Sequence, residues 1–266
     1  MDKKELWLAL SALGVAATAT TNVFAAPEHV GAVNTANVSV EGQLAHDALR
    51  VLFVGSDVFR DETIRTNDTG LVHLMFIDQS SLTIGPNSEL VLDHFVYDPE
   101  TNNGELSISA AKGILRFVGG ALSKNGTVTV KTPVGNLGIR GAVVLIDIEK
   151  DGGEVSGCIL YGNELTGTTT STNISKTVSE HEQCVILTPG GQIRTEPVSP
   201  TRLQQLLTAL QGPPSETAPT GREVTLPDNY TGWLRELVNK QAWDRILDKE
   251  KFNADAFNRD IDELAS

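Results

Sequence analysis

Short apolar runs rich in β-branched residues alternate with turn residues through the middle of the chain. From residue 49 to residue 195 these runs return at a spacing of about 8–12 residues, which is typical of sandwiches and barrels. No helical period separates them, so the sequence predicts an all-β domain with a sandwich or rolled-sheet architecture. Glycine, asparagine and proline mark the turns, at residues 67–70, 85–87, 102–104, 125–126, 151–153 and 189–191.

The turn at Asn125 and the segment before residue 49 add detail to this prediction. Asn125 and Gly126 lie between two apolar runs, and both residues accept positive φ, so they predict a tight hairpin. Residues 26–48 are small and polar, with two brief β-like pieces. We assign them to an N-terminal extension that either adds edge strands or remains loose.

A helical period replaces the β pattern after residue 198. Ser199 can cap a helix and Pro200 is tolerated in its first turn, so the leucine stripe that follows predicts a short amphipathic helix over residues 199–210. Residues 211–222 form a proline-rich linker. Residues 223–266 are predicted to form a helical tail, which either packs back onto the sheet or binds another protein. The apolar residues proposed for that contact are Trp233, Leu237, Trp243 and Ile246.

Residues 1–25 have the features of a cleavable signal peptide. A short basic start at Lys3 and Lys4 precedes an apolar run over residues 6–17, and Val23 and Ala25 fit the −3 and −1 positions of a signal-peptidase site. A bilayer span needs about 20 apolar residues, so a retained anchor is the less favoured alternative. The sequence therefore predicts an exported protein, located in the periplasm or outside the cell.

The two cysteines are interpreted in the light of this export. An even number of cysteines in an oxidising compartment favours a disulfide, here between Cys158 and Cys184. A reactive thiol or a metal site is the alternative. Only His181 lies near them in the sequence, and the spacing does not match that of zinc ligands.

The acidic composition argues against several classes of partner. The formal net charge of −13 repels nucleic-acid phosphates and anionic lipid headgroups. Solubility explains this charge, and binding of cations or of a basic protein is the alternative. Beyond the signal peptide, Trp233 and Trp243 are the only tryptophans. Both lie outside the β-domain, which therefore lacks the aromatic platforms common in carbohydrate-binding domains.

Four segments, in order, resemble the FecR domain of bacterial envelope proteins. They are an opening strand and turn at 51–66, two strands with an Asp-turn and a Gly-Pro-Asn-Ser corner at 69–90, the strand 113–118, and a Thr-Pro to Arg-Gly signature at 131–141. In the best-known members this domain relays the occupancy of an outer-membrane siderophore receptor to a cytoplasmic sigma factor. The present sequence shows neither a cytoplasmic regulatory segment nor a transmembrane helix, so it is more similar to exported stand-alone relatives.

The residues that carry this resemblance have structural reasons to be there, and some of them could also bind a ligand. We expect the turn residues to bond backbone amides. We expect Arg140 to be partly buried and held by backbone carbonyls, with a ligand contact as the alternative. The full set is Asp78, Ser80, Gly85, Pro86, Asn87, Ser88, Thr132, Pro133, Arg140 and Gly141.

Patterns typical of catalysis or of cofactor binding are missing from the sequence. The histidines and cysteines lack metal-ligand spacing, and no Gly-x-Ser-x-Gly elbow occurs. Gly135, Gly138 and Gly141 are not followed by a helical pattern, which argues against a dinucleotide site. No enzyme activity, metal or cofactor is therefore predicted. We expect a non-catalytic protein-interaction module of the envelope that acts in sensing or assembly and binds through sheet edges or the tail. A secreted polysaccharide- or peptidoglycan-binding surface protein of the adhesin type is the alternative.

Overall fold

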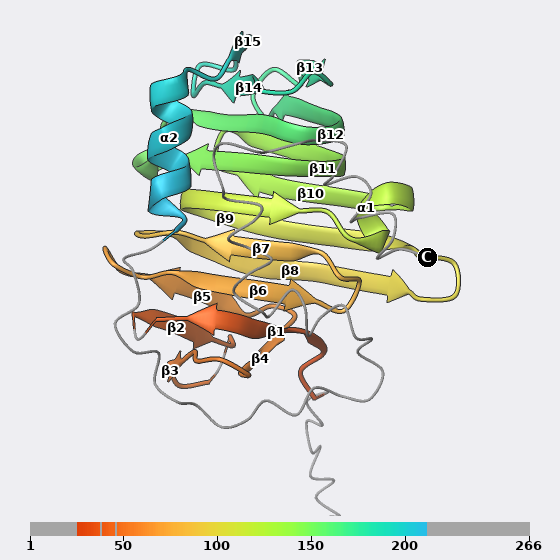
Figure 1. Cartoon of the computed structure of the whole chain (residues 1–266), viewed down its shortest axis with the longest axis vertical. Helices are drawn as coiled ribbons and strands as arrows, with labels where there is room; N and C mark the ends of the chain where they lie inside the picture. Colours follow the sequence, from red (N-terminus) through yellow and green to blue (C-terminus); the bar gives the residue numbers. More distant parts are fainter. Residues whose placement is uncertain (1–25, 38, 46, 212–266) are drawn as a thin grey trace, which may run out of the picture.

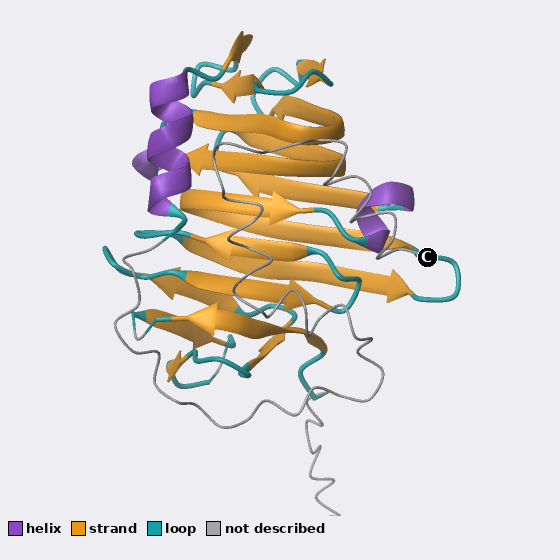
Figure 2. Ribbon diagram, viewed as in Figure 1, coloured by secondary structure: helices purple, strands orange, loops and turns teal. Residues whose placement is uncertain are grey.

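A computed structural model describes residues 26–37, 39–45 and 47–211. These residues form a continuous network of paired strands that folds over into two layers (Figures 1 and 2). The prediction of an all-β sheet fold is confirmed. The predicted signal peptide and the predicted helical tail lie outside the described residues. No helix within the described ranges is long and apolar enough to cross a membrane.

Each layer is built from short strands plus one half of each of three long strands. Sheet I contains the short strands β4 (Asp57–Phe59), β1 (His29–Ala36), β6 (Val72–Phe76), β7 (Ser81–Ile84), β14 (Gln183–Leu187) and β15 (Ile193–Pro197). Sheet II contains β3 (Arg50–Val51), β2 (Val40–Gln43), β5 (Thr63–Thr66), β8 (Glu89–Asp98), β10 (Thr127–Thr132) and β13 (Ser175–Val178). Both layers therefore draw on the same three long strands at their centre.

The long strands are β9 (Asn103–Val118), β11 (Gly135–Ile148) and β12 (Val155–Thr169). One part of each pairs within sheet II and the other part pairs within sheet I. The change of layer coincides with a glycine of positive φ in each strand, at Gly113 (117°), Gly141 (54°) and Gly162 (124°). A side chain at Gly113 would place its Cβ 2.1 Å from the Ser88 hydroxyl oxygen. These bends explain why three strands can serve both layers.

One hydrophobic core fills the space between the layers. Alternate residues of the strands point inward, as expected for a sandwich, and belong to a single cluster of buried side chains. Phe76 of sheet I and Phe95 of sheet II stack with their ring centroids 5.8 Å apart, so they join the two layers directly. Burial of each such ring stabilises the fold by about 1.5–3 kcal/mol.

The hairpin predicted at Asn125 and Gly126 is wrong. A short helix, α1 (Ala121–Asn125), occupies this position, Gly126 has a negative φ of −107°, and β10 runs parallel to the first half of β9. The bend of β9 explains this difference. It places the second half of β9 in sheet I, whereas β10 lies in sheet II. The link between the two strands therefore crosses from one layer to the other instead of reversing direction within one sheet.

Residues 26–48 contribute regular strands to both layers. β1 lies between β6 and β4 in sheet I, and β2 lies between β5 and β3 in sheet II. The segment assigned to an N-terminal extension is thus built into the same sandwich. Val30, Val33 and Val40 are buried in the common core, which accounts for this integration.

A second helix, α2 (Pro200–Ala209), lies against the outer face of sheet I (Figure 1). It begins as predicted, because the Ser199 hydroxyl accepts a hydrogen bond from the Arg202 backbone N–H at 3.2 Å. Leu206 and Leu210 pack on Leu145 of β11. The short 3-10 helix η1 (Lys150–Gly152) connects β11 to β12.

Candidate interaction surface

An apolar surface lies at the β3 edge of sheet II. Among the described strands, β3 pairs only with β2, so the outer side of β3 is open (Figure 1). The adjoining loop and strand carry four exposed large apolar side chains, which we call the edge patch: Leu49 (56% exposed), Val51 (55%), Phe53 (65%) and Val54 (40%). Contiguous exposed apolar residues on a folded protein mark a binding surface far more often than scattered ones do.

The segment that carries the edge patch is firmly held. Leu52 is fully buried, and its N–H donates to the Val40 carbonyl at 3.0 Å. Arg50 donates from Nε and Nη2 to the two carboxylate oxygens of Glu62, at 2.9 Å each. The Glu62 side chain is fully buried and also accepts from the Phe59 N–H at 3.1 Å. This bidentate pair orders the backbone beside the patch, so little conformational entropy remains to be lost on binding.

The sequence carries a signal for this surface. The run over residues 49–54 predicts a strand, but its apolar residues occupy both alternating faces. Leu52 points into the core, whereas Leu49, Val51 and Phe53 point to solvent. A surface strand with an apolar outer face is unusual outside a binding surface or the core of a larger sheet.

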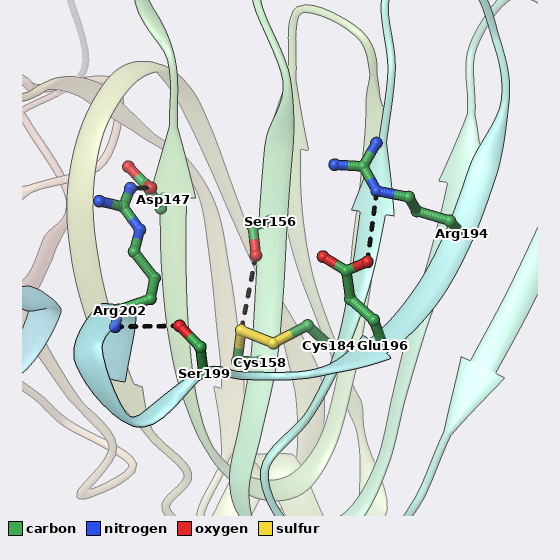
Figure 3. The surroundings of a disulfide bond; sticks show 8 residues. All are labelled: Asp147, Ser156, Cys158, Cys184, Arg194, Glu196, Ser199 and Arg202. Carbon is green, nitrogen blue, oxygen red and sulfur yellow. Dashed lines mark hydrogen bonds and ion pairs between the residues drawn. A yellow bond between two sulfur atoms is a disulfide. The ribbon is translucent and has the colours of Figure 1, made fainter. Parts of the chain in front are cut away.

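The predicted disulfide between Cys158 and Cys184 is present. The two residues face each other on β12 and β14, with an S–S distance of 2.04 Å (Figure 3). They lie on the outer face of sheet I, where Ile186 and Val198 cover them. The bond fastens β14, and through it β15 and α2, to the centre of the sandwich.

A cleft of about 420 Å³ opens beside this disulfide, and its rim is charged. Arg194 donates to both carboxylate oxygens of Glu154, at 2.7 and 2.8 Å, and this pairing lowers the pKa of the Glu154 carboxyl. Arg202 forms an ion pair with Asp147 (Figure 3). These pairs connect β15 and α2 to neighbouring strands, so the charges of the rim fasten the C-terminal elements.

Asp78 and Ser80 form a buried turn, as their residue types predicted. One Asp78 oxygen accepts from the Ser80 N–H at 3.1 Å and from the Ser80 hydroxyl at 2.6 Å. The other oxygen accepts from the Leu122 N–H of α1 at 3.2 Å. Burial raises the pKa of the Asp78 carboxyl, and these hydrogen bonds oppose the rise. The carboxylate therefore joins the β6–β7 turn to α1.

The Gly85 to Ser88 corner is also held by internal hydrogen bonds. The Gly85 carbonyl accepts from the Thr66 hydroxyl at 2.7 Å and from the Ser88 hydroxyl at 2.8 Å. Asn87 is exposed with a φ of 55°, next to the half-buried Pro86. Ser88 lies directly against Gly113, so this corner and the bend of β9 meet at one edge of the sandwich.

The remaining signature residues lie along sheet II. The Thr132 hydroxyl donates to the Gly135 carbonyl at 2.6 Å and closes the β10–β11 turn, beside the exposed Pro133. Gly141 forms the bend of β11. The expectation of a partly buried Arg140 is wrong, because its side chain is exposed on β11, opposite Glu164 of β12. The signature residues are thus distributed over both sheets and do not line a common pocket.

The buried arginine of the described residues is Arg116 on β9, which pairs with Thr83 of β7, and Thr83 in turn pairs with His73 of β6. Arg116 donates to the Thr83 hydroxyl at 3.2 Å, and His73 bonds Asn34 at 3.2 Å. Burial, together with the nearby Arg116 charge, lowers the pKa of His73 from 6.5 to about 3. Burial also lowers the pKa of Arg116 to about 10. We call the side chains of His73, Thr83 and Arg116 the polar row.

The pKa of His73 predicts a loss of stability in acid. An unfolded chain binds a proton at His73 near pH 6.5, whereas the folded chain does so only near pH 3. The stability linked to neutral His73 is therefore complete above pH 6.5 and falls as the pH drops toward 3. When the pH is lowered from 7.5 to 5, the free energy of unfolding should fall in both proteins. The fall is expected to be about 2 kcal/mol smaller in His73→Gln than in the unaltered protein. Urea unfolding at both pH values measures this difference.

The exposed His181 provides a control for the acid measurement. His181→Gln should follow the unaltered protein at both pH values. Equal losses in His73→Gln and in the unaltered protein would contradict the role assigned to His73.

Comparisons with known proteins bear on this geometry. The family model described as "FecR protein" matches residues 62–163. No curated protein matches the chain. Two crystal structures described as a "putative anti-sigma factor" from Parabacteroides distasonis ATCC 8503 are similar over 55% of this chain, each at 9% identity with a TM-score of 0.43. The match spans 64% and 63% of those chains, which is less than two thirds of their length.

The family match begins at the buried Glu62 and ends just past the bend of β12 at Gly162. It takes in all ten signature residues named from the sequence. No group of three or more His, Cys, Asp or Glu within the described ranges is placed to hold a metal ion. The edge patch, within residues 49–54, lies N-terminal to the matched region and outside it. Residues 62–163 of this chain therefore match the FecR family model, and the segments on either side lie outside the match.

Proposed function

We propose that this protein is a non-catalytic interaction module of the bacterial envelope and that it binds a protein partner through the edge patch. The observation that carries the proposal is the ordered display of four exposed apolar side chains beside the open strand β3. The FecR domain supports the envelope setting. The features of residues 1–25 support export to the periplasm or to the cell exterior.

The open strand suggests what kind of partner segment fits. An exposed edge offers backbone N–H and C=O groups, to which an extended segment of another protein can add as a further strand. Val51 and Phe53 would contact alternate side chains of that segment. The partner is therefore expected to supply a short extended stretch with apolar residues at every second position.

Phe53→Asp is expected to lower partner capture by at least about 10-fold, because it places a charge at the centre of an apolar contact. The melting temperature should change little, since the Phe53 side chain is 65% exposed. The measurement is crosslinking in intact cells, with a photo-reactive residue at Val51, followed by mass spectrometry of the captured proteins.

The control for this experiment is Ile174→Asp. Ile174 is 50% exposed in the β12–β13 turn, far from the edge patch along the sheet (Figure 1). This variant should capture the same proteins as the unaltered chain. Identical capture by Phe53→Asp and Ile174→Asp would refute the edge patch as the binding surface.

Binding of polysaccharide or peptidoglycan is a second candidate function, and the outer face of sheet II favours it. Small polar residues form rows across the strands there, with hydrogen bonds of 2.8 Å between the hydroxyls of Thr166 and Thr177 and of Thr168 and Ser175. Such hydroxyls can bond sugar hydroxyls. Retention on a glycan array that is unchanged by Phe53→Asp would support this function over the first.

A further inference from the structure

The outward-facing positions of β6, β7 and β9 are buried. Within these strands Leu74, Leu82 and Phe117 belong to the core between the layers. The alternate residues point to the opposite side of sheet I and do not belong to that core, yet they are 4–8% exposed. These residues are His73, Met75, Thr83 and Arg116. An outer sheet face with buried side chains must be covered by another part of the molecule.

The apolar contacts of α2 account for a different part of this face. The helix packs on Ile114, Leu145 and Leu160, which lie in β9, β11 and β12. His73 and Thr83 lie further along the sheet, in β6 and β7, beyond the strands on which α2 packs. On the far side of these strands, Thr35 of β1 pairs with His73 and is exposed. The buried band is therefore bounded on one side by α2 and on the other by β1.

The chain leaves α2 next to this band. Leu210, directly after the helix, lies against Gly85 at the end of β7, where a Cβ built on Gly85 would be 3.2 Å from the Leu210 side chain. Figure 1 shows the C-terminal end of α2 at the level of β9 and β7. Residues 212–266 follow, and an extended stretch of about ten residues reaches more than about 30 Å. Crossing from β9 over β7 to β6 requires only about 10 Å, because neighbouring strands lie about 4.8 Å apart.

We propose that the segment following the linker, residues 223–266, docks on the outer face of sheet I over β6, β7 and β9. The occupant is this chain's own C-terminal segment. Its apolar residues include Trp233 and Trp243, which supply large apolar areas to cover Met75 and the edges of the polar row. The inference is independent of the proposed function, because it concerns sheet I and leaves the edge patch of sheet II free for a partner.

The test uses the full chain and a fluorescent label whose emission tryptophan quenches at short range. Thr83→Cys introduces the only free thiol, since the natural cysteines are paired, and this thiol is labelled with bimane. In the docked state the nearby tryptophans are expected to quench the bimane emission at least about two-fold. Replacing Trp233 and Trp243 by phenylalanine should restore the emission.

The matched control places the same label at Thr177, an exposed position on sheet II. Bimane there should be equally bright with and without the two tryptophans. Quenching at Thr83 that is independent of protein concentration supports docking within one chain. Quenching that disappears on dilution would assign the cover to a second copy and overturn the proposal. Equal emission at Thr83 with and without the tryptophans would also overturn it. A folded Thr83→Cys variant is verified by its melting temperature before labelling.

Discussion

Replacing Cys158 and Cys184 together by alanine is expected to lower the free energy of unfolding by about 3–4 kcal/mol. The disulfide closes a loop between residues 26 positions apart, and loss of a loop of this size restores the corresponding entropy to the unfolded chain. The melting temperature should fall by about 10 °C, given about 2–4 °C per kcal/mol for a chain of this size. Urea and thermal unfolding, followed by circular dichroism, measure both quantities.

A reducing agent serves as the control for the disulfide prediction. Dithiothreitol added during unfolding should bring the unaltered protein to the stability of the double variant. The variant itself should not respond. If the unaltered protein and the variant have the same urea midpoint without reductant, the bond contributes no stability and the prediction fails.

Asp78→Ala is expected to lower the free energy of unfolding by about 3 kcal/mol. The substitution leaves the buried N–H groups of Ser80 and Leu122 without their acceptor, and each unsatisfied buried donor costs about 1–3 kcal/mol. Because the carboxylate joins the β6–β7 turn to α1, hydrogen exchange at Leu122 should also accelerate. Chemical denaturation together with exchange measured by NMR tests both effects.

Asp68→Ala is the matched control, since Asp68 lies in an exposed turn. Its effect should stay within about 0.5 kcal/mol. Asp78→Asn separates the two hydrogen-bonding roles. Its amide oxygen can still accept from Ser80, but its NH₂ group cannot accept from Leu122. An intermediate loss is expected, and no loss in Asp78→Ala would refute the structural role.

Local sequence patterns were sufficient to predict the class of the fold and many of its strands. The short runs rich in β-branched and aliphatic residues over 71–77, 89–97 and 184–187 correspond to β6, β8 and β14, and Ser199 begins α2 as expected. The cysteines pair as predicted. These features depend on residues that are close in sequence or on the chemistry of one residue type, which is why pattern analysis reaches them.

The arrangement of the layers could not be predicted in the same way. The pattern divides β9 into two strands at residues 106–109 and 114–118, whereas the structure has one strand bent at Gly113. A glycine inside an apolar run can mark either a turn or a bend, and only the partners of the flanking residues decide between them. The same ambiguity produced the wrong hairpin at Asn125, because parallel pairing of β9 and β10 depends on that bend.

The candidate binding surface was partly visible in the sequence. Sheet edges were expected to bind a partner, but which edge would do so depends on the order of strands across the sheet. The edge patch depends on two facts of the tertiary structure, since β3 ends sheet II and Leu52 is the buried apolar residue of its run. Arg140 was misjudged for a related reason, since its neighbours Gly138 and Gly141 do not reveal which layer the residue faces.

The three strands shared by both layers have a mechanical consequence. In a sandwich whose layers are joined only by loops, a pulling force can slide one sheet over the other by shearing side-chain contacts. Here β9, β11 and β12 pass covalently from one layer to the other at Gly113, Gly141 and Gly162. Sliding would have to break the backbone pairing of all three strands together. A pulling force applied at the edge of one layer would thus be distributed over the strand pairing of both layers.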